Sequence, residues 1–405
     1  MMRNVHQAIK VTDDVFWVGA IDWQVRDFHG YLTHRGTTYN AYLVLGKHPT
    51  LIDTVKLGFG GEMLSRIASV MDPSDIELVV SNHAEVDHSG ELATTLDIIK
   101  PDRVLASAKG VEALGQHFDI PQPIEAVADG DTLDLGGMGL TFAMTPMLHW
   151  PDSMVSYLDK GAVLFSQDAF GMHLAGVERF ADQVPDAILL EEAAKYFANI
   201  VLPFAPNVLR AIDKLDGLGV PLNVIAPDHG PVWRAETGRI VGLYANWAKQ
   251  PRSKSAAIVY DSMWGSTARM ARAVEEGLRQ GGVPVTVMPL EACHRSDVAT
   301  QLLEAGALVV GSATLNGMLL PRMADVLTYV RGLRPKGLIG AAFGSYGWSG
   351  EAVKQMEQML EEAKVEVVAT GVRHRYVPRE DALRACHELG GAVASRLRET
   401  YDRTE

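Results

Sequence analysis

The sequence predicts a chain of two domains: a layered α+β sandwich, followed by a doubly wound α/β domain with a five-stranded parallel sheet. Three observations lead to this fold class. The chain has 405 residues, which is more than one domain usually contains, since domains mostly have roughly 100–200 residues. Strands and amphipathic helices alternate regularly only in the later part of the chain. A polar, proline-containing stretch, residues 246–255, separates the two patterns. We place the boundary near Arg252, which gives domains 1–251 and 252–405.

The first domain is rich in strands and irregular in pattern. Short apolar runs bounded by polar and turn residues predict strands, and longer amphipathic runs predict helices. Mixed strands and helices over this length fit a layered α+β sandwich. The predicted strands are residues 38–46, 50–55, 76–82, 103–107, 140–146, 162–169 and 222–230, and the predicted helices are 61–71, 89–100 and 191–218.

The second domain alternates strands with helices in the manner of a doubly wound fold. Its predicted strands are residues 256–262, 283–290, 307–314, 337–346 and 366–372, and an amphipathic segment follows each of them. The pattern therefore predicts five parallel strands with helices on both faces of the sheet.

Composition narrows the possible functions. With 47% hydrophobic and 21% charged residues, the chain is typical of a globular protein rather than a disordered one. A formal net charge of −13 and the lack of a basic run argue against nucleic-acid binding. No stretch approaches the roughly 20 apolar residues of a membrane helix, and the N-terminus does not look like a signal peptide. The two cysteines, Cys293 and Cys386, form no CxxC, so we expect a reducing, cytoplasmic setting.

Residues 81–90, SNHAEVDHSG, hold four potential metal ligands within six positions. They follow the apolar run 76–80, so they lie where a predicted strand ends, a position from which a rigid scaffold presents ligands. A solvated surface does not explain so dense a cluster. Three further candidates occur at later strand ends. The full set is His83, Glu85, Asp87, His88, His149, Asp168 and His229.

Four imidazoles and three carboxylates suffice for two metal ions that share a bridging carboxylate. Taken alone, His149 and His229 are more often structural histidines, and Asp168 a turn or helix cap. The occurrence of all seven residues together is explained by metal binding, because bound cations remove the repulsion between close carboxylates. Zinc hydrolases of the metallo-β-lactamase type usually have HxHxDH, whereas this chain has Glu85 at the second position. A carboxylate there favours iron or manganese, although spacing alone leaves zinc open.

Three loops of the second domain predict a mononucleotide site at the carboxyl edge of its sheet. A helix N-terminus with hydroxyls binds a phosphate through N–H groups and the helix dipole, and neither GxGxxG nor GxxxxGK is present. Trp264, Tyr346 and Trp348 can pack around a flat isoalloxazine ring, which points to FMN. The predicted FMN-binding residues are Ser262, Met263, Trp264, Gly265, Ser266, Thr267, Ala313, Thr314, Leu315, Asn316, Ser345, Tyr346, Gly347 and Trp348.

These residues together resemble the flavodiiron proteins, also called A-type flavoproteins, and especially the rubredoxin:oxygen oxidoreductases among them. The resemblance rests on GTTYNAYLV, HWPDSMVSY, YFANIV, YDSMWGST and AAFGSYGWSGE, which span nearly the whole chain. It implies a metallo-β-lactamase-like αββα sandwich with a non-haem di-iron centre, followed by a flavodoxin-like domain that binds FMN. The family commonly has SPT where this chain has Ser312, Ala313 and Thr314. Losing the proline relaxes a φ constraint but keeps the Thr hydroxyl, so we expect FMN binding to survive.

The resemblance also implies roles for the site residues. His83, Glu85 and His149 would bind one iron, Asp87, His88 and His229 the other, and Asp168 would bridge them. Tyr196 and His29 are implied as neighbouring residues of the reaction site. His173 is a third candidate, with a packed structural histidine as the alternative.

The implied activity is reduction of O2 to water, of NO to N2O, or both. A head-to-tail homodimer, possibly assembled into a homotetramer, would bring the flavin of one subunit beside the di-iron site of the other. The chain lacks the CxxC pairs of an appended rubredoxin, so we expect a separate donor: a rubredoxin, or alternatively a coenzyme-type flavin. Two other functions stay open: a dinuclear zinc hydrolase fused to a flavodoxin, and an electron carrier or redox sensor whose metal domain is structural.

Overall fold

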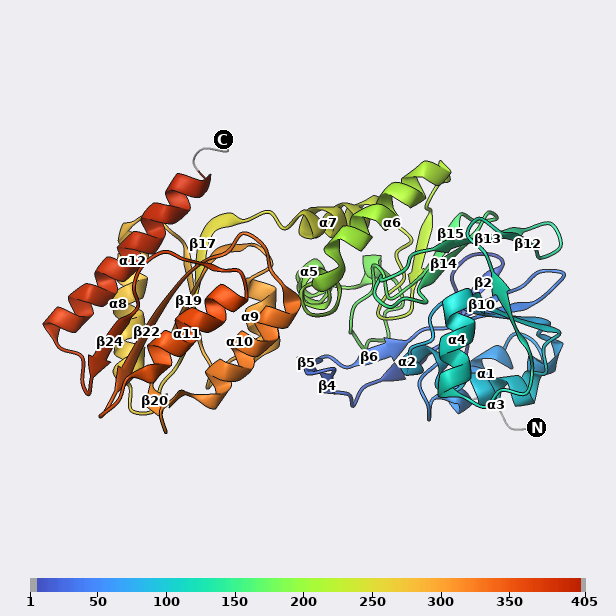
Figure 1. Cartoon of the computed structure of the whole chain (residues 1–405). Coiled ribbons are helices and arrows are strands. Elements are labelled where there is room, and N and C mark those ends of the chain that lie inside the picture. Colours follow the sequence, from blue (N-terminus) through green and yellow to red (C-terminus); the bar gives the residue numbers. More distant parts are fainter. Residues whose placement is uncertain (1–5, 402–405) are drawn as a thin grey trace. The chain divides into compact units, whose positions relative to one another are not determined.

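The computed structural model describes residues 6–401 (Figure 1). The first five and last four residues, which the predicted domains include, lie outside the described residues. The chain divides into two compact units: Met1–Tyr196 with Phe204–Ala245, and Phe197–Pro203 with Asn246–Glu405. The boundary at residues 251 and 252 stays a prediction; the first strand of the second unit, β17, begins at Ser253.

The first unit contains two large sheets. The first has seven strands in the order β1-β2-β7-β8-β9-β10-β11, and the second has five in the order β12 to β16. The bounds in the first are β1 (Ile9–Lys10), β2 (Val15–Trp17), β7 (Tyr42–Val44), β8 (Thr50–Ile52), β9 (Leu78–Ser81), β10 (Arg103–Ser107) and β11 (Ile124–Val127). In the second they are β12 (Thr132–Asp134), β13 (Gly139–Met144), β14 (Met154–Leu158), β15 (Val163–Gln167) and β16 (Val224–Pro227).

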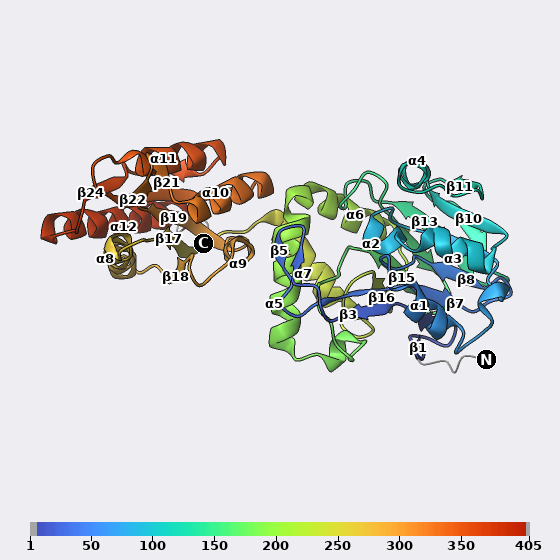
Figure 2. The same ribbon diagram turned by 90° about the horizontal axis from the view of Figure 1, so that it is seen from below.

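The two faces of the first sheet have separate cores. Tyr42 and Val44 of β7 pack with Phe142 and Phe165 of the second sheet, whereas Leu43 between them packs in the core of the outer face, as strand alternation requires. Helices α1 (Gly60–Ile67), α3 (Leu92–Ile99) and α4 (Ala108–His117) cover that outer face. Helices α5 (Asp186–Tyr196), α6 (Ala205–Leu218) and α7 (Thr237–Lys249) complete the αββα sandwich (Figures 1 and 2), which confirms the predicted fold class.

The structure divides two segments that the sequence pattern predicted as continuous. The strand 38–46 splits into β6 (Thr37–Tyr39) and β7, because Asn40 leaves the ladder: its N–H donates to Asp228 O at 2.7 Å and its amide donates to Pro227 O at 2.6 Å. The helix 191–218 is interrupted by a π-helical turn (Phe197–Val201) and a 3-10 turn (Leu202–Phe204). Pro203 and Pro206 lack the N–H groups that a continuous helix needs.

Small antiparallel pairs complete the first unit beside its large sheets. β3 (Ala20–Asp22) pairs with β6, and β4 (Asp27–Phe28) pairs with β5 (Tyr31–Leu32). The short helix α2 (Val86–Ser89) follows β9. None of the helices within residues 6–401 is long and apolar enough to span a membrane.

The second unit is a parallel sheet in the order β18-β17-β19-β22-β23, with β24 also paired to β22. The bounds are β17 (Ser253–Asp261), β18 (Val285–Pro289), β19 (Ala305–Ser312), β22 (Ile339–Tyr346), β23 (Glu366–Val367) and β24 (Val372–Arg375). This is the predicted doubly wound sheet, except that the fifth strand is divided into β23 and β24. The division lies before Gly371, whose N–H donates to Glu357 Oε1 at 2.6 Å instead of to the ladder.

Helices cover both faces of this sheet. Ala256 and Ile258 of β17 pack toward α8 (Ser266–Gln280) and α12 (Glu380–Tyr401). The alternate residues, Ala257 and Val259, pack toward α9 (Arg295–Gln301), α10 (Pro321–Leu333) and α11 (Glu351–Glu362). A two-residue Asn-Gly turn joins β20 (Thr314–Leu315) to β21 (Met318–Leu319), and both turn residues have the positive φ that such hairpins need.

Candidate metal centre and mononucleotide site

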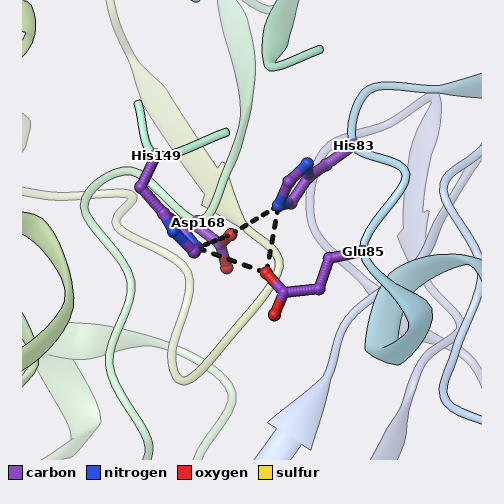
Figure 3. A group of neighbouring side chains, drawn as sticks. All are labelled: His83, Glu85, His149 and Asp168. Carbon is purple, nitrogen blue, oxygen red and sulfur yellow. Dashed lines mark hydrogen bonds and ion pairs between the residues drawn. The ribbon is translucent and has the colours of Figure 1, made fainter. Parts of the chain in front are cut away.

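Four side chains from three segments form one compact group of ligand atoms (Figure 3). His83 and Glu85 follow β9, His149 lies in the loop between β13 and β14, and Asp168 follows β15 directly. Glu85 Oε2 lies 3.2 Å from His83 Nε2 and 3.3 Å from His149 Nε2. Asp168 Oδ2 lies 3.3 Å from His83 Nε2 and 3.1 Å from His149 Nε2. The four atoms enclose a space suited to one cation.

A second group lies against the other oxygen of Asp168. Asp87, His88 and His229 offer ligand atoms close to one another, with Asp87 Oδ2 at 3.1 Å from His229 Nε2 and 3.4 Å from His88 Nε2. Asp168 Oδ1 lies 3.2 Å from His88 Nε2 and 3.5 Å from His229 Nε2. The two oxygens of Asp168 therefore face different groups, as a bridging carboxylate does.

The polar atoms of this site fit a pair of metal ions. His83, Asp87, His88, Asp168 and His229 are all buried. Both carboxylate oxygens of Asp87 and the Oδ2 atom of Asp168 have no hydrogen-bond partner among the described residues. Buried carboxylates are rarely left unpaired because desolvation is costly. Cations between the two groups would satisfy these oxygens, so the donor set fits a dinuclear centre.

The pKa values of the metal-free site reflect the same crowding. Burial alone would lower the pKa of His149, but the adjacent carboxylates of Asp168 and Glu85 raise that pKa to about 9. Burial would raise the pKa of Glu85, but His149, His29 and His83 hold it well below its usual range. Imidazolium charges thus balance the carboxylates, and metal ions can replace those protons.

Several side chains that hold the ligands were not singled out from the sequence. Asp152 Oδ2 accepts from the Ala84 N–H at 2.6 Å and lies 3.1 Å from His83 Nδ1. His229 Nδ1 lies 2.6 Å from Thr38 O. Such contacts orient each imidazole so that Nε2 faces the centre. Asp152 lies three residues after His149 in HWPDS, yet sequence spacing gave no sign that it contacts His83.

The three candidate catalytic residues all lie near the two groups. The Tyr196 hydroxyl donates to Asp168 Oδ1 at 3.0 Å, and His29 Nε2 lies 2.7 Å from Glu85 Oε1. The His173 ring centre is 4.5 Å from that of His229, and its Nδ1 lies 2.8 Å from Thr37 Oγ1. Burial lowers the pKa of His173 well below its usual value. His173 thus packs beside the centre without contacting the donor atoms through a hydrogen bond.

In the second unit, the loop after β17 has the features of a phosphate site. Gly265 precedes α8 with φ +82° and provides no side-chain cap to the helix. The Ser262 hydroxyl is buried and has no hydrogen-bond partner within the described part of the chain. An uncapped helix N-terminus beside an unpaired hydroxyl fits a phosphate group. Thr267 Oγ1 lies 2.9 Å from Ser345 Oγ, which joins the first turn of α8 to the end of β22.

Exposed aromatic side chains accompany these loops. Trp264 is 90% exposed and Trp348 is 86% exposed, and Met263 and Leu315 are also exposed. Large apolar side chains rarely gather in water without a function. Trp264 and Trp348 belong to two of the loops at the carboxyl edge of the sheet, so the residues fit a flat, apolar ring. The predicted roles of the individual metal and flavin residues stay predictions.

Comparison with known proteins agrees with this architecture. Residues 37–230 match the ODP family beta lactamase domain, and residues 258–390 match flavodoxin. A nitric oxide reductase of Moorella thermoacetica is 41% identical over 395 residues, which span 96% of this chain and 99% of that protein.

A rubredoxin-oxygen oxidoreductase of Megalodesulfovibrio gigas is 43% identical over 396 residues, which span 97% of this chain and 98% of that protein. Among solved structures, rubredoxin oxygen:oxidoreductase from Desulfovibrio gigas has a TM-score of 0.95, at 43% identity and with 97% of this chain and 99% of that chain covered. The flavodiiron protein from Giardia intestinalis has a TM-score of 0.94 at 33% identity, with 98% of each chain covered.

Fold and site together define a two-domain redox protein in which a metallo-β-lactamase-like domain precedes a flavodoxin-like one. The chain belongs to the flavodiiron proteins.

Proposed function

We propose that this chain reduces O2 to water, NO to N2O, or both, at a non-haem di-iron centre, with electrons passing through FMN from an external donor such as rubredoxin. The observation that carries the proposal is Asp168, whose two oxygens face two separate ligand groups. The names of the two relatives, a nitric oxide reductase and a rubredoxin-oxygen oxidoreductase, support both substrates and the donor.

The proposed iron ligands are the seven residues of the two groups. His83, Glu85 and His149 would hold one iron, and Asp87, His88 and His229 the other. Asp168 would bridge them. Two carboxylates in the first group, where a zinc hydrolase has more imidazoles, favour a redox-active metal.

When bound, two ferrous ions and one reduced FMN together supply the four electrons that reduction of O2 requires. The protein's own groups hold the ligands in place. The Asp152 carboxylate fixes the His83 ring, and the Tyr196 hydroxyl donates to Asp168 Oδ1.

His29 is proposed to hold a proton beside the centre. Its hydrogen bond with Glu85 raises the pKa of its imidazole, and its side chain is 56% exposed, so solvent can return a proton to it. His173 is proposed to pack against the His229 ring and keep that imidazole in place.

The three loops at the carboxyl edge of the second sheet are proposed to bind FMN. The buried Ser262 hydroxyl and the α8 N-terminus would receive the phosphate. Trp264, Tyr346 and Trp348 would pack around the isoalloxazine ring.

The active assembly is proposed to be a head-to-tail homodimer, possibly within a homotetramer, because symmetric dimers are the commonest oligomers. A monomer at working concentration with full turnover would contradict this. The unpaired thiols of Cys293 and Cys386 support a reducing, cytoplasmic setting.

Two measurements test the proposal. Purified protein should contain about two iron atoms and one FMN per chain, and reduced rubredoxin should drive consumption of O2 or NO at parallel electrodes. Two zinc atoms with negligible iron would favour the dinuclear hydrolase instead. Uptake of electrons without consumption of either gas would favour a carrier.

A matched pair of variants tests the ligand assignment. Glu85→Ala should lower iron content and both activities, whereas Glu112→Ala, an exposed glutamate of the same unit, should change neither. Full iron content and activity in Glu85→Ala would discredit the assigned site.

A further inference from the structure

The acidity of the chain is confined to its first domain. Residues 1–251 contain 18 Lys and Arg against 32 Asp and Glu, a net charge of −14, whereas residues 252–405 contain 19 against 18, a net charge of +1. A negatively charged protein is therefore repelled by the first domain and much less so by the second.

A group of positively charged side chains lies at the outer edge of the sheet of the second domain. β24 pairs only with β22 and appears at the edge of this unit in Figures 1 and 2. Residues 372–379, VRHRYVPR, which we call the basic edge segment, include Arg373, His374, Arg375 and Arg379. Arg373, Arg375 and Arg379 are exposed.

These cations are not neutralised by neighbouring acids. Over residues 6–401, no carboxylate forms an ion pair with Arg373, Arg375 or Arg379. Glu380, the next acidic residue along the chain, lies 3.5 Å from Arg384 instead. Some other exposed arginines of this unit do have a carboxylate partner, as Arg331 has in Glu362 and Arg279 has in Glu275. The basic edge segment thus presents uncompensated charge.

The segment is continuous with the loop proposed to hold the flavin ring. Arg375 pairs in register with Tyr346, and its Nε donates to Gly347 O at 2.7 Å. The Tyr376 N–H donates to Tyr346 O at 2.6 Å. A Cβ at Gly347 would lie 3.6 Å from the Tyr376 ring. A protein seated on this segment is therefore adjacent to the flavin loop.

Exposed apolar area lies between the charges. Tyr376 is 58% exposed and Val377 57% exposed. Tyr376 also has φ +61°, a left-handed conformation that is uncommon for bulky side chains and that is often kept for function. Tyr and Arg are the residues enriched at the centres of protein interfaces.

We propose that the basic edge segment is the docking surface for a small acidic redox protein that delivers electrons to the flavin. The inference rests on the proposed function, since it needs a flavin at the adjacent loop. The occupant is identified by charge complementarity with Arg373 and Arg379 and by continuity with the flavin loop. An acidic partner docked here contacts a domain without net negative charge and passes electrons to the flavin over a short path.

The test is stopped-flow reduction of the FMN-loaded protein by an acidic reduced rubredoxin at several ionic strengths. The variant is Arg373→Gln with Arg379→Gln, which leaves Arg375 and its bond to Gly347 intact. The matched control is Arg334→Gln with Lys364→Gln, two exposed cations of the same domain that follow α10 and α11 at the opposite end of the sheet.

At low ionic strength, the variant should lose about tenfold in the second-order rate constant and much of its salt dependence. The control should lose little, because it removes equal charge at a distant place. Photochemical reduction of the flavin should be equally fast in all three proteins.

Four outcomes would overturn the docking surface. The variant and the wild type could have equal rate constants and equal salt dependence. The rate constant of the control could also fall as far as that of the variant. Third, the variant could dissociate on light scattering where wild type is a dimer, which would make the segment an interface between copies. The wild-type protein could also consume O2 or NO after photoreduction and yet accept no electrons from acidic rubredoxin. That result would reject the docking surface and leave the proposed function intact. Failure to consume either gas would reject the function itself.

Discussion

Replacing Asp152 by asparagine is expected to weaken iron binding without removing a ligand. Asp152 is 3% exposed, and its Oδ2 serves both the Ala84 N–H at 2.6 Å and His83 Nδ1 at 3.1 Å. Because both groups contact the same oxygen, an asparagine with its amide oxygen in that place keeps both contacts but carries no charge, and the flipped amide turns its NH2 toward both. The His83 ring then loses the charge that fixes its orientation.

The magnitude follows from other metal sites. Loss of a carboxylate that orients a metal-bound histidine costs about 10- to 100-fold in metal affinity, which corresponds to about 1.4–2.7 kcal/mol. The assay is anaerobic competition for Fe²⁺ against a chelator, with circular dichroism as a check on folding and FMN content as a check that the other unit is unaffected. Asp119→Asn, at an exposed aspartate, is the control. Iron affinity in Asp152→Asn equal to that of the control would refute the reasoning.

Three further predictions concern the flavin, protons and packing. Ser262→Ala should raise the dissociation constant of FMN roughly 10-fold or more by removing a charge-assisted hydrogen bond, as measured by fluorescence titration; an unchanged constant would exclude this hydroxyl from the phosphate site. His149, with a pKa of about 9, is protonated near pH 7 in iron-free protein, and neighbouring carboxylates also raise the pKa of His83 and His88, so iron uptake should release at least one proton and apparent affinity should fall as the pH drops from 9 to 7; a proton count near zero by indicator dye would contradict this. Gly311→Ala places a Cβ 2.3 Å from Phe343 Cζ and should destabilise the second unit by about 1–3 kcal/mol in urea, whereas Gly391→Ala, in open space within α12, should not.

Local sequence patterns accounted for most of the fold. The five strands of the second unit were predictable because each is an apolar run followed by an amphipathic helix, as in residues 256–282. The interruptions were not. Asn40 leaves its strand because its partners, Pro227 and Asp228, lie far along the chain, and a period-2 pattern carries no information about such distant partners.

The sequence by itself determined which chemical groups are available: a segment with four ligands after β9, later histidines and an aspartate at strand ends, and hydroxyls and aromatic side chains in three loops. Only the tertiary structure decided how they combine. It directs the two oxygens of Asp168 toward different groups, and it brings Asp152 against His83. The physical reason is that a side chain's identity sets what it can bind, whereas packing of distant strands sets which atoms come within bonding distance.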